Sequence, residues 1–245
     1  MNILTVAAIR MFLLKSNGGD SIQLYIFNIA SLDEPLSHPE WKDNFSSGRW
    51  EKIIKYQQIL HRKQGAGAGW LLQYAMKKNG VLDRKKELQY GKHGKPMHSD
   101  IYFNLSHSGD YVICAISKKE VGCDIQKIRM PNRNLMEKFY TDWEQDYVLH
   151  GGSQKKRKER FVTIWALKES YLKKTGEGLT RELSDISFEI GDSIVMTDNN
   201  IKMPEKFTTF YIEDYVIALC GEEDLLLTEK MNQLEEIQNF LSDYE

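Results

Sequence analysis

The sequence of 245 residues has few cysteines and prolines, almost no net charge, and no long uninterrupted apolar run. Its three cysteines, Cys114, Cys123 and Cys220, all lie in apolar segments, so we expect buried free thiols in a reducing compartment. The 33 basic and 35 acidic residues leave a formal net charge of −2, which gives no argument for nucleic acid or an anionic membrane as partner. The apolar segment 1–15 contains Arg10 and is shorter than the roughly 20 apolar residues of a membrane span. We therefore expect a cytoplasmic protein.

Periodicity along the chain predicts strands and helices in alternating groups. Apolar or alternating runs predict strands at 22–27, 111–116, 121–126, 186–190, 193–196, 207–212 and 215–220. Helical spacing predicts helices at 50–78, 135–149, 161–174 and 225–241, with a basic loop at 151–160. Three glycines interrupt the first helix, and we interpret them as sites of close helix packing. Helices followed by antiparallel-looking strands in each half indicate an α+β fold.

The segment 103–126 carries the first candidate site. It begins with FNLSHSG, a strand end that turns into a polar loop, and it ends in the apolar strand 121–126. Because side chains alternate across a strand, Asp124 and Gln126 share one face of that strand. A carboxylate in an apolar strand is costly unless it is paired or binds a metal ion. We therefore expect a functional site at Asp124.

The helix predicted at 161–174 carries the second candidate site. Helical spacing puts Trp165, Lys168, Glu169 and Lys173 close to one face, where they form either a surface ion-pair stripe or a site. Two acidic positions, a histidine and several lysines suit a magnesium-dependent reaction on a pyrophosphate. The Gly/Lys/Pro loop at 90–96 is either a solvated turn or a cationic loop that contacts a phosphate.

Four segments in order resemble the motifs of one enzyme family. GKPMHSD, FNLSHSG, VGCDIQK and WALKESYLK are similar to the motifs of Sfp-type 4′-phosphopantetheinyl transferases, and the resemblance covers about residues 21–220. It implies an α+β pseudo-dimer of two similar subdomains with the active site in the cleft between them. The implied division is an N-terminal extension at 1–20 and subdomains at 21–118 and 119–245. Met11 is an alternative start of the chain.

The resemblance also implies an activity and a set of site residues. A monomeric enzyme of this family transfers the 4′-phosphopantetheine arm of coenzyme A to a serine of an apo carrier protein, with Mg²⁺ as cofactor and 3′,5′-ADP as leaving group. The implied roles are catalysis by Glu169 and Lys173, metal binding by Asp124, Gln126 and Glu169, and coenzyme A binding by Arg49, Lys52, Lys95, Ser106 and His107. Arg62 and Lys63 compete with Arg49 and Lys52 for the 3′-phosphate, whereas Trp165 and Lys168 are expected to shape the helix.

Gln126 departs from the family pattern, which has a second acidic residue at this position of the strand. An amide is a weaker ligand than a carboxylate, so Gln126 binds the metal directly or holds a water that does. Two other functions stay open: an inactive homologue that binds coenzyme A or a carrier, and a magnesium-dependent pyrophosphate hydrolase acting on coenzyme A. The carrier is expected to dock at 130–146, or alternatively at the basic segment 154–160. The expected apolar contacts of the first dock are Phe139 and Tyr140, and its expected basic contacts are Arg129, Arg133 and Lys138. Carriers of fatty acid, polyketide, nonribosomal peptide and amino-acid biosynthesis are all candidates.

Overall fold

A computed structural model describes residues 9–15, 21–81, 88–150, 152–222 and 226–232 of the chain. Its first half contains two α-helices, α1 (Ser47–Lys55) and α2 (Ile59–Lys78), and the short 3-10 helices η1 (Pro35–Ser37) and η2 (Pro39–Asn44). The main sheet has the order β13-β1-β2-β6-β5, and all its neighbouring strands are antiparallel. Its strands are β1 (Ile9–Lys15), β2 (Ser21–Asn28), β5 (Tyr102–Ser108), β6 (Tyr111–Ser117) and β13 (Leu226–Asn232). A small hairpin of β3 (Gln89–Tyr90) and β4 (Pro96–Met97) precedes β5.

The second half is built around one long helix, α5 (Gln154–Thr175). This helix packs on an antiparallel sheet of order β11-β12-β7, formed by β7 (Gly122–Lys127), β11 (Lys206–Ile212) and β12 (Tyr215–Gly221). The shorter helices are α3 (Arg133–Phe139), α4 (Asp142–Leu149), η3 (Gly178–Thr180) and η4 (Leu183–Asp185). A second small sheet has the order β10-β9-β8, with β8 (Ile186–Ile190), β9 (Ile194–Asp198) and β10 (Ile201–Lys202).

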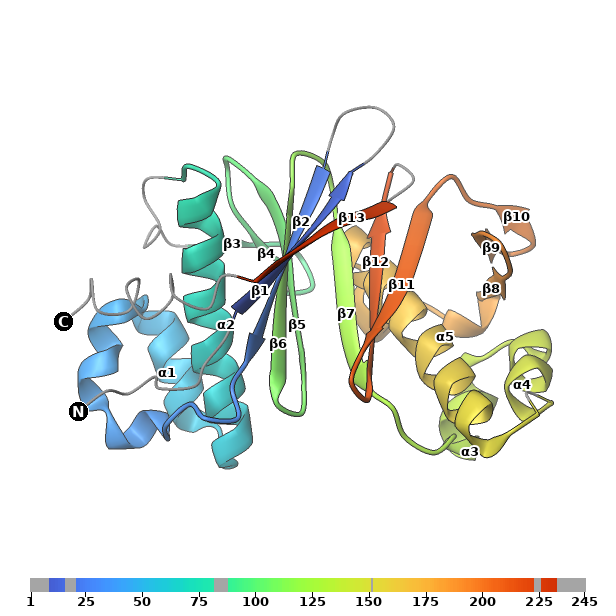
Figure 1. The fold of residues 1–245 in the computed structure, drawn as a ribbon, viewed down its shortest axis with the longest axis horizontal. Helices are drawn as coiled ribbons and strands as arrows, with labels where there is room; N and C mark the ends of the chain where they lie inside the picture. Colours follow the sequence, from blue (N-terminus) through green and yellow to red (C-terminus); the bar gives the residue numbers. More distant parts are fainter. Residues whose placement is uncertain (1–8, 16–20, 82–87, 151, 223–225, 233–245) are drawn as a thin grey trace.

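The two halves stack as four layers, with α2 and α5 on the outside and the two sheets between them (Figure 1). One core lies between α2 and the first sheet, and another between α5 and the second sheet. A third core joins the sheets through residues such as Leu24, Ile113, Ile125 and Leu219, all 0% exposed. Apolar burial on both faces explains why these strands read as continuous apolar runs. The predicted α+β fold is confirmed.

The glycines of α2 allow the close packing that the sequence predicted. A Cβ at Gly67 would lie 2.7 Å from Ile29 Cγ2, and one at Gly69 would lie 2.5 Å from Phe45 Cε1. They do not interrupt the helix, however, because the predicted helix 50–78 breaks earlier, at 56–58 between α1 and α2. The predicted helix 135–149 is likewise two helices, since Thr141 begins α4 with a capping box to Glu144.

Three other predictions differ from the structure. The basic loop expected at 151–160 is helical from Gln154 onward, because the Ser153 side chain caps α5 by accepting the Lys156 amide. The helix expected at 225–241 is wrong at 226–232, which form strand β13 along the edge of β1; residues 225 and 233–241 lie outside the described residues. In the predicted N-terminal extension, residues 9–15 form β1 and pair with β2. No helix in the described ranges is long and apolar enough to cross a membrane.

Candidate active site

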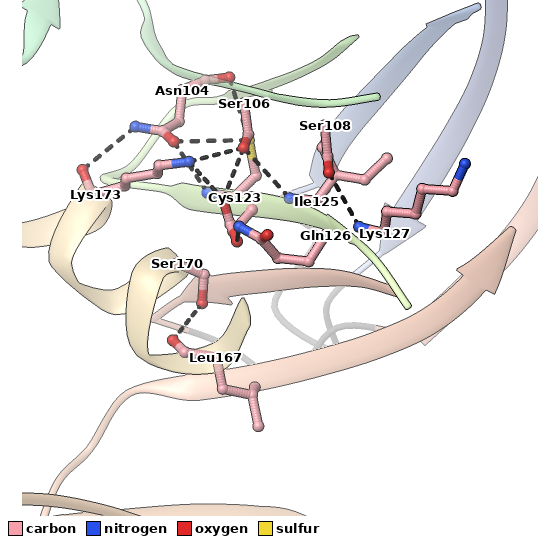
Figure 2. Close-up of polar contacts among 11 residues, drawn as sticks. Asn104, Ser106, Ser108, Cys123, Ile125, Gln126, Lys127, Leu167, Ser170 and Lys173 are labelled. Carbon is pink, nitrogen blue, oxygen red and sulfur yellow. Dashed lines mark hydrogen bonds and ion pairs between the residues drawn. The ribbon is translucent and has the colours of Figure 1, made fainter. Parts of the chain in front are cut away.

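Strands β5 and β7 meet at the junction of the two sheets, where side chains replace a main-chain ladder (Figure 2). Side chains from alternate positions of β5 accept hydrogen bonds from alternate amides of β7: Asn104 Oδ1 from Cys123 at 3.1 Å, Ser106 Oγ from Ile125 at 3.3 Å, and Ser108 Oγ from Lys127 at 3.0 Å. The two-residue period of a strand puts these three polar side chains on one face. The FNLSHS motif therefore joins the two halves, and we call this junction the seam.

Asp124 lies at the centre of the seam with its side chain 1% exposed. Its Oδ1 atom accepts hydrogen bonds from Lys173 Nζ at 2.6 Å and from Ser106 Oγ at 2.7 Å. Its Oδ2 atom accepts one from Gln126 Nε2 at 2.9 Å. The carboxylate predicted to need a partner thus has three, contributed by both strands and by α5 (Figure 2).

Helix α5 reaches the seam because glycine occupies the contact point on β7. A Cβ at Gly122 would lie 1.9 Å from the Ser170 carbonyl oxygen and 2.7 Å from the Lys174 amide nitrogen, so any larger residue would push the helix away. This contact brings the last two turns of α5, which carry Glu169 and Lys173, onto β7. A side chain at position 122 would therefore separate Lys173 from Asp124.

Burial and neighbouring charges shift the pKa values of Glu169 and Lys173, the two candidate catalytic groups on α5. Burial raises the pKa of Glu169, the negative charge of Asp124 raises it further, and Lys173 offsets only part of this increase. Burial disfavours the ammonium of Lys173, but the charges of Asp124 and Glu169 outweigh burial and raise its pKa. A raised carboxyl pKa beside another carboxylate indicates a place where one further cation is favourable.

The donor set fits magnesium. Among the described residues no three acidic, histidine or cysteine side chains form a ready-made metal cluster. The seam instead brings together two carboxylates, Asp124 and Glu169, beside the amide of Gln126. Magnesium commonly binds one or two carboxylates and completes its octahedral shell with water and phosphate oxygens. These residues therefore suit an ion that binds together with a phosphate-bearing substrate.

The predicted phosphate-binding residues Arg49 and Lys52 both lie on α1, and Lys52 is close enough to His107 for its charge to act on the imidazole. Burial lowers the pKa of Arg49, whose Cδ would be 3.0 Å from a Cβ at Gly69, and this side chain has no ion pair with a described residue. Partial burial lowers the pKa of His107, and the positive charges of Lys173, His61 and Lys52 lower it further. This concentration of positive charge favours a polyanionic ligand.

The competing candidates Arg62 and Lys63 are engaged elsewhere. Arg62 forms an ion pair with Glu34 at 2.6 Å, and its NH1 group donates to the Tyr56 and Gln57 carbonyl groups. Lys63 Nζ lies 3.4 Å from the Ala30 carbonyl oxygen. Arg62 is therefore committed to contacts within the first half, and Lys63 makes one exposed contact there.

Lys95 and Lys168 have partners that the sequence did not predict. The Lys95 ammonium donates to the Lys174 carbonyl oxygen at 2.5 Å, at the end of α5. Lys168 is 0% exposed and pairs with Glu144 at 2.8 Å in the second core, so the expected stripe of Lys168, Glu169 and Lys173 is divided between two faces. This burial agrees with the expectation that Lys168 shapes the helix.

Sequence reasoning missed Asn104, although the alternation N-x-S-x-S was a visible signal.

Comparisons with known proteins point to one class of enzymes. Residues 120–220 match the family model of the 4′-phosphopantetheinyl transferase superfamily. A 4′-phosphopantetheinyl transferase of Bacillus subtilis is 29% identical over 203 residues, which cover 78% of this chain and 89% of the relative. Sfp of Bacillus subtilis strain 168 is 28% identical over 195 residues, covering 76% and 84%. The L-aminoadipate-semialdehyde dehydrogenase-phosphopantetheinyl transferase of Xenopus laevis is 36% identical over 132 residues, covering 51% and 42%.

This chain is similar to Sfp-type 4′-phosphopantetheinyl transferases over about three quarters of its length, and its residues 120–220 match the model of the superfamily. Asp124, Gln126, Glu169 and Lys173 lie within the matched range 120–220, whereas the seam residues of β5 precede it. The family match therefore covers the β7 and α5 side of the seam.

Proposed function

We propose that this chain transfers the 4′-phosphopantetheine arm of coenzyme A to a serine hydroxyl of an apo carrier protein. The serine oxygen forms a bond to the phosphorus that bears the pantetheine arm. The bond from this phosphorus to the bridging oxygen breaks, and 3′,5′-ADP leaves with that oxygen. The observation that carries the proposal is the seam, where Asp124 from β7 and Lys173 from α5 meet at 2.6 Å beside Glu169.

Glu169 and Lys173 perform the proton and charge steps of this proposal. Glu169 accepts the proton of the attacking serine, and its raised pKa brings its basicity closer to neutral pH, where general bases act best. Lys173 stays protonated because Asp124 and Glu169 raise its pKa, and its ammonium neutralises charge that develops on the leaving oxygen.

Asp124 and Glu169 are the residues that would hold Mg²⁺, with Gln126 as a direct ligand or as the holder of a bound water. When bound, this ion supplies charge neutralisation and orientation at the pyrophosphate. Gln126 lies beside Asp124 with its Nε2 atom 2.9 Å from Asp124 Oδ2, so its amide oxygen remains available for a ligand or water.

Arg49, Lys52 and His107 bind the phosphate groups of coenzyme A in this proposal. Arg49 carries a charge that burial disfavours, and a phosphate beside it would compensate that charge. His107 has a lowered pKa without ligand, and a bound phosphate would raise it by favouring the protonated ring. We therefore expect coenzyme A binding to be accompanied by proton uptake at His107 when the pH lies above the lowered pKa of the unliganded ring.

The carrier docks beside the seam through residues 130–146 in this proposal. Arg133 and Lys138 are exposed and suit the acidic helix of a carrier. Tyr140, which we expected to contact the carrier, is 2% exposed and donates its hydroxyl to the Phe161 carbonyl oxygen, so that expectation was wrong. Met130 and Trp143 are 53% and 45% exposed and supply the apolar contact instead.

Intact-mass measurement of apo carrier proteins tests the proposal. Incubation with this chain, coenzyme A and Mg²⁺ should add one phosphopantetheine unit to a carrier and release 3′,5′-ADP, and a carrier whose serine is replaced by alanine should gain nothing. Phosphopantetheine formed from coenzyme A without a carrier would indicate the hydrolase instead. Coenzyme A binding with no product on any carrier would indicate an inactive homologue.

A further inference from the structure

The C-terminal end of α5 is held by side chains from the other half of the molecule. The last carbonyl groups of a helix have no partner within the helix. At the end of α5 the Gly176 amide bonds to the Leu172 carbonyl oxygen at 2.8 Å. The next two carbonyl oxygens accept from the first half: Lys173 O from Asn104 Nδ2 at 3.3 Å, and Lys174 O from Lys95 Nζ at 2.5 Å.

Asn104 connects three elements that carry the site. It is 4% exposed on β5, its Oδ1 atom accepts the Cys123 amide of β7 at 3.1 Å, and its Nδ2 atom reaches α5. Cys123 precedes Asp124, and the carbonyl group that Asn104 holds belongs to Lys173 itself. The Asn104 side chain therefore holds the main chain next to Asp124 and at Lys173, the two residues of the ion pair (Figure 2).

Lys95 holds the same turn of α5 from the loop that follows β3. Its stem packs over Gly176, where a Cβ would lie 3.2 Å from Lys95 Cδ. Gly176 has a φ of 75°, the left-handed conformation that glycine adopts easily, and ends the helix there. A lysine near a helix C-terminus both donates to the free carbonyl groups and interacts favourably with the helix dipole. Its ammonium is therefore engaged by the protein.

We infer that Asn104 and Lys95 form an interdomain clamp on the end of α5, and that both are positioning residues for Glu169 and Lys173. This inference rests on the proposed function, because it assigns these residues to the same reaction. Displacing catalytic groups by about 1 Å can lower a rate by about 10²-fold. As a positioning residue, Lys95 affects the rate of transfer. A lysine that bound a phosphate of coenzyme A would instead affect the affinity for coenzyme A.

Kinetics of Lys95→Met and Asn104→Asp distinguish these roles. Methionine keeps the apolar stem over Gly176, and aspartate keeps the acceptor for the Cys123 amide, but each variant loses its donor to α5. We expect kcat at saturating coenzyme A to fall about 10- to 100-fold in each, with the calorimetric Kd for coenzyme A within about twofold of wild type. Lys95→Arg, which restores a donor, should recover most of the rate.

Lys118→Met is the matched control, because Lys118 is an exposed lysine that lines the same cavity as Lys95. It should leave both kcat and Kd unchanged. A Kd raised about tenfold or more in Lys95→Met with kcat retained would make Lys95 a coenzyme ligand and overturn the clamp. Unchanged kcat in both Lys95→Met and Asn104→Asp would overturn it too. If Lys95→Met does not fold, Asn104→Asp and Lys95→Arg still decide between these outcomes.

Hydrogen exchange tests the clamp without any activity. Loss of a holding contact allows local opening of a helix end, so amides at 173–176 should exchange about tenfold faster in Lys95→Met and Asn104→Asp than in wild type. Lys118→Met should exchange as wild type does. A wild-type chain that modifies no carrier would contradict the proposed function alone, whereas unchanged exchange in both clamp variants would contradict the clamp alone.

Discussion

Helix α5 contributes one lysine to each of two lysine–carboxylate clusters, and these clusters differ in their surroundings. Lys168 and Glu144 are both 0% exposed and 2.8 Å apart. Lys168 also donates to the Leu183 and Ile186 carbonyl groups, and Glu144 accepts the Thr141 and Phe188 amides. This cluster is closed, because every charge within it is matched by a partner in the protein.

The cluster at the seam is open. The Lys173 side chain is 29% exposed, and it pairs with Asp124 while a second carboxylate, Glu169, stands beside them with a raised pKa. The Glu169 carboxylate has no hydrogen bond to another described residue, so two carboxylates share one lysine. Removing one partner of a closed pair leaves a buried unpaired charge and lowers stability, whereas an open cluster retains charge that a metal ion or a substrate can satisfy. The burial and the partners of the charged groups, rather than their spacing in the sequence, distinguish the closed structural cluster from the candidate active site.

Replacing Asp124 should produce the largest effect on the open cluster. Asp124→Ala removes the partner of Lys173 and a proposed metal ligand, so we expect transfer to fall by more than about 10³-fold. Single-turnover transfer to an apo carrier measures this loss. Transfer within tenfold of wild type would show that the seam is not the reaction centre.

Glu169→Gln should separate catalysis from stability. Loss of a general base typically lowers a rate about 10²- to 10⁴-fold, while coenzyme A should still bind. Because the folded-state pKa of Glu169 is raised, this carboxyl stabilises the fold only at low pH, and its contribution is lost as pH rises from the unfolded value through the folded value. At pH 8 glutamine should therefore give a Tm equal to or above that of wild type. Near-normal turnover would show that Glu169 is not the general base. A Tm of Glu169→Gln below that of wild type at pH 8 would contradict the expectation that the ionised Glu169 carboxylate destabilises the fold.

Lys168→Met should show the opposite pattern. Breaking a buried ion pair leaves Glu144 as an unpaired charge, which costs about 3–5 kcal/mol of unfolding free energy. The rate per folded molecule should change little, because Lys168 points away from the seam. Urea unfolding and transfer kinetics on the same sample check both statements. The double variant Lys168→Met with Glu144→Gln should recover part of the stability, and a rate loss that persists in it would place this pair in the mechanism.

Gln126 should show the smallest effect among the seam residues. Two carboxylates suffice for magnesium, so Gln126→Ala should lower transfer only modestly, by about tenfold or less. Gln126→Glu should stay active and saturate at a lower magnesium concentration, because it adds a negative charge beside Asp124. Transfer rate against magnesium concentration measures both variants. A Gln126→Ala variant as inactive as Asp124→Ala would make the glutamine a necessary direct ligand.

The sequence predicted much of this site because burial and spacing are local signals. Asp124 stands out in an apolar strand, and Glu169 and Lys173 lie one turn apart on a strong helix. Spacing could not separate Lys168 from Lys173, because periodicity does not tell which face of a helix meets which sheet. The closed pair depends on Glu144, which comes from a different helix.

Contacts between distant segments account for the remaining differences. The clamp of Asn104 on the Lys173 carbonyl group forms only when the two halves meet. Strand β13 replaces the predicted helix because the edge of β1 offers main-chain partners to residues 226–232, and such pairing overrides local preference. Thr141 shows the converse: its capping box with Glu144 is a local signal, present in the sequence and overlooked within one predicted helix.

The most direct test of the open cluster is amide NMR of the full chain with coenzyme A and substoichiometric Mn²⁺ as a paramagnetic substitute for Mg²⁺. We expect broadening centred on Ser106, Asp124 and Gln126 of the seam and on Glu169 and Lys173 of α5, with the resonances of Glu144 and Ile186 beside the closed pair retained. Broadening centred on the closed pair, or none at the seam while coenzyme A is bound, would contradict a metal site at the open cluster.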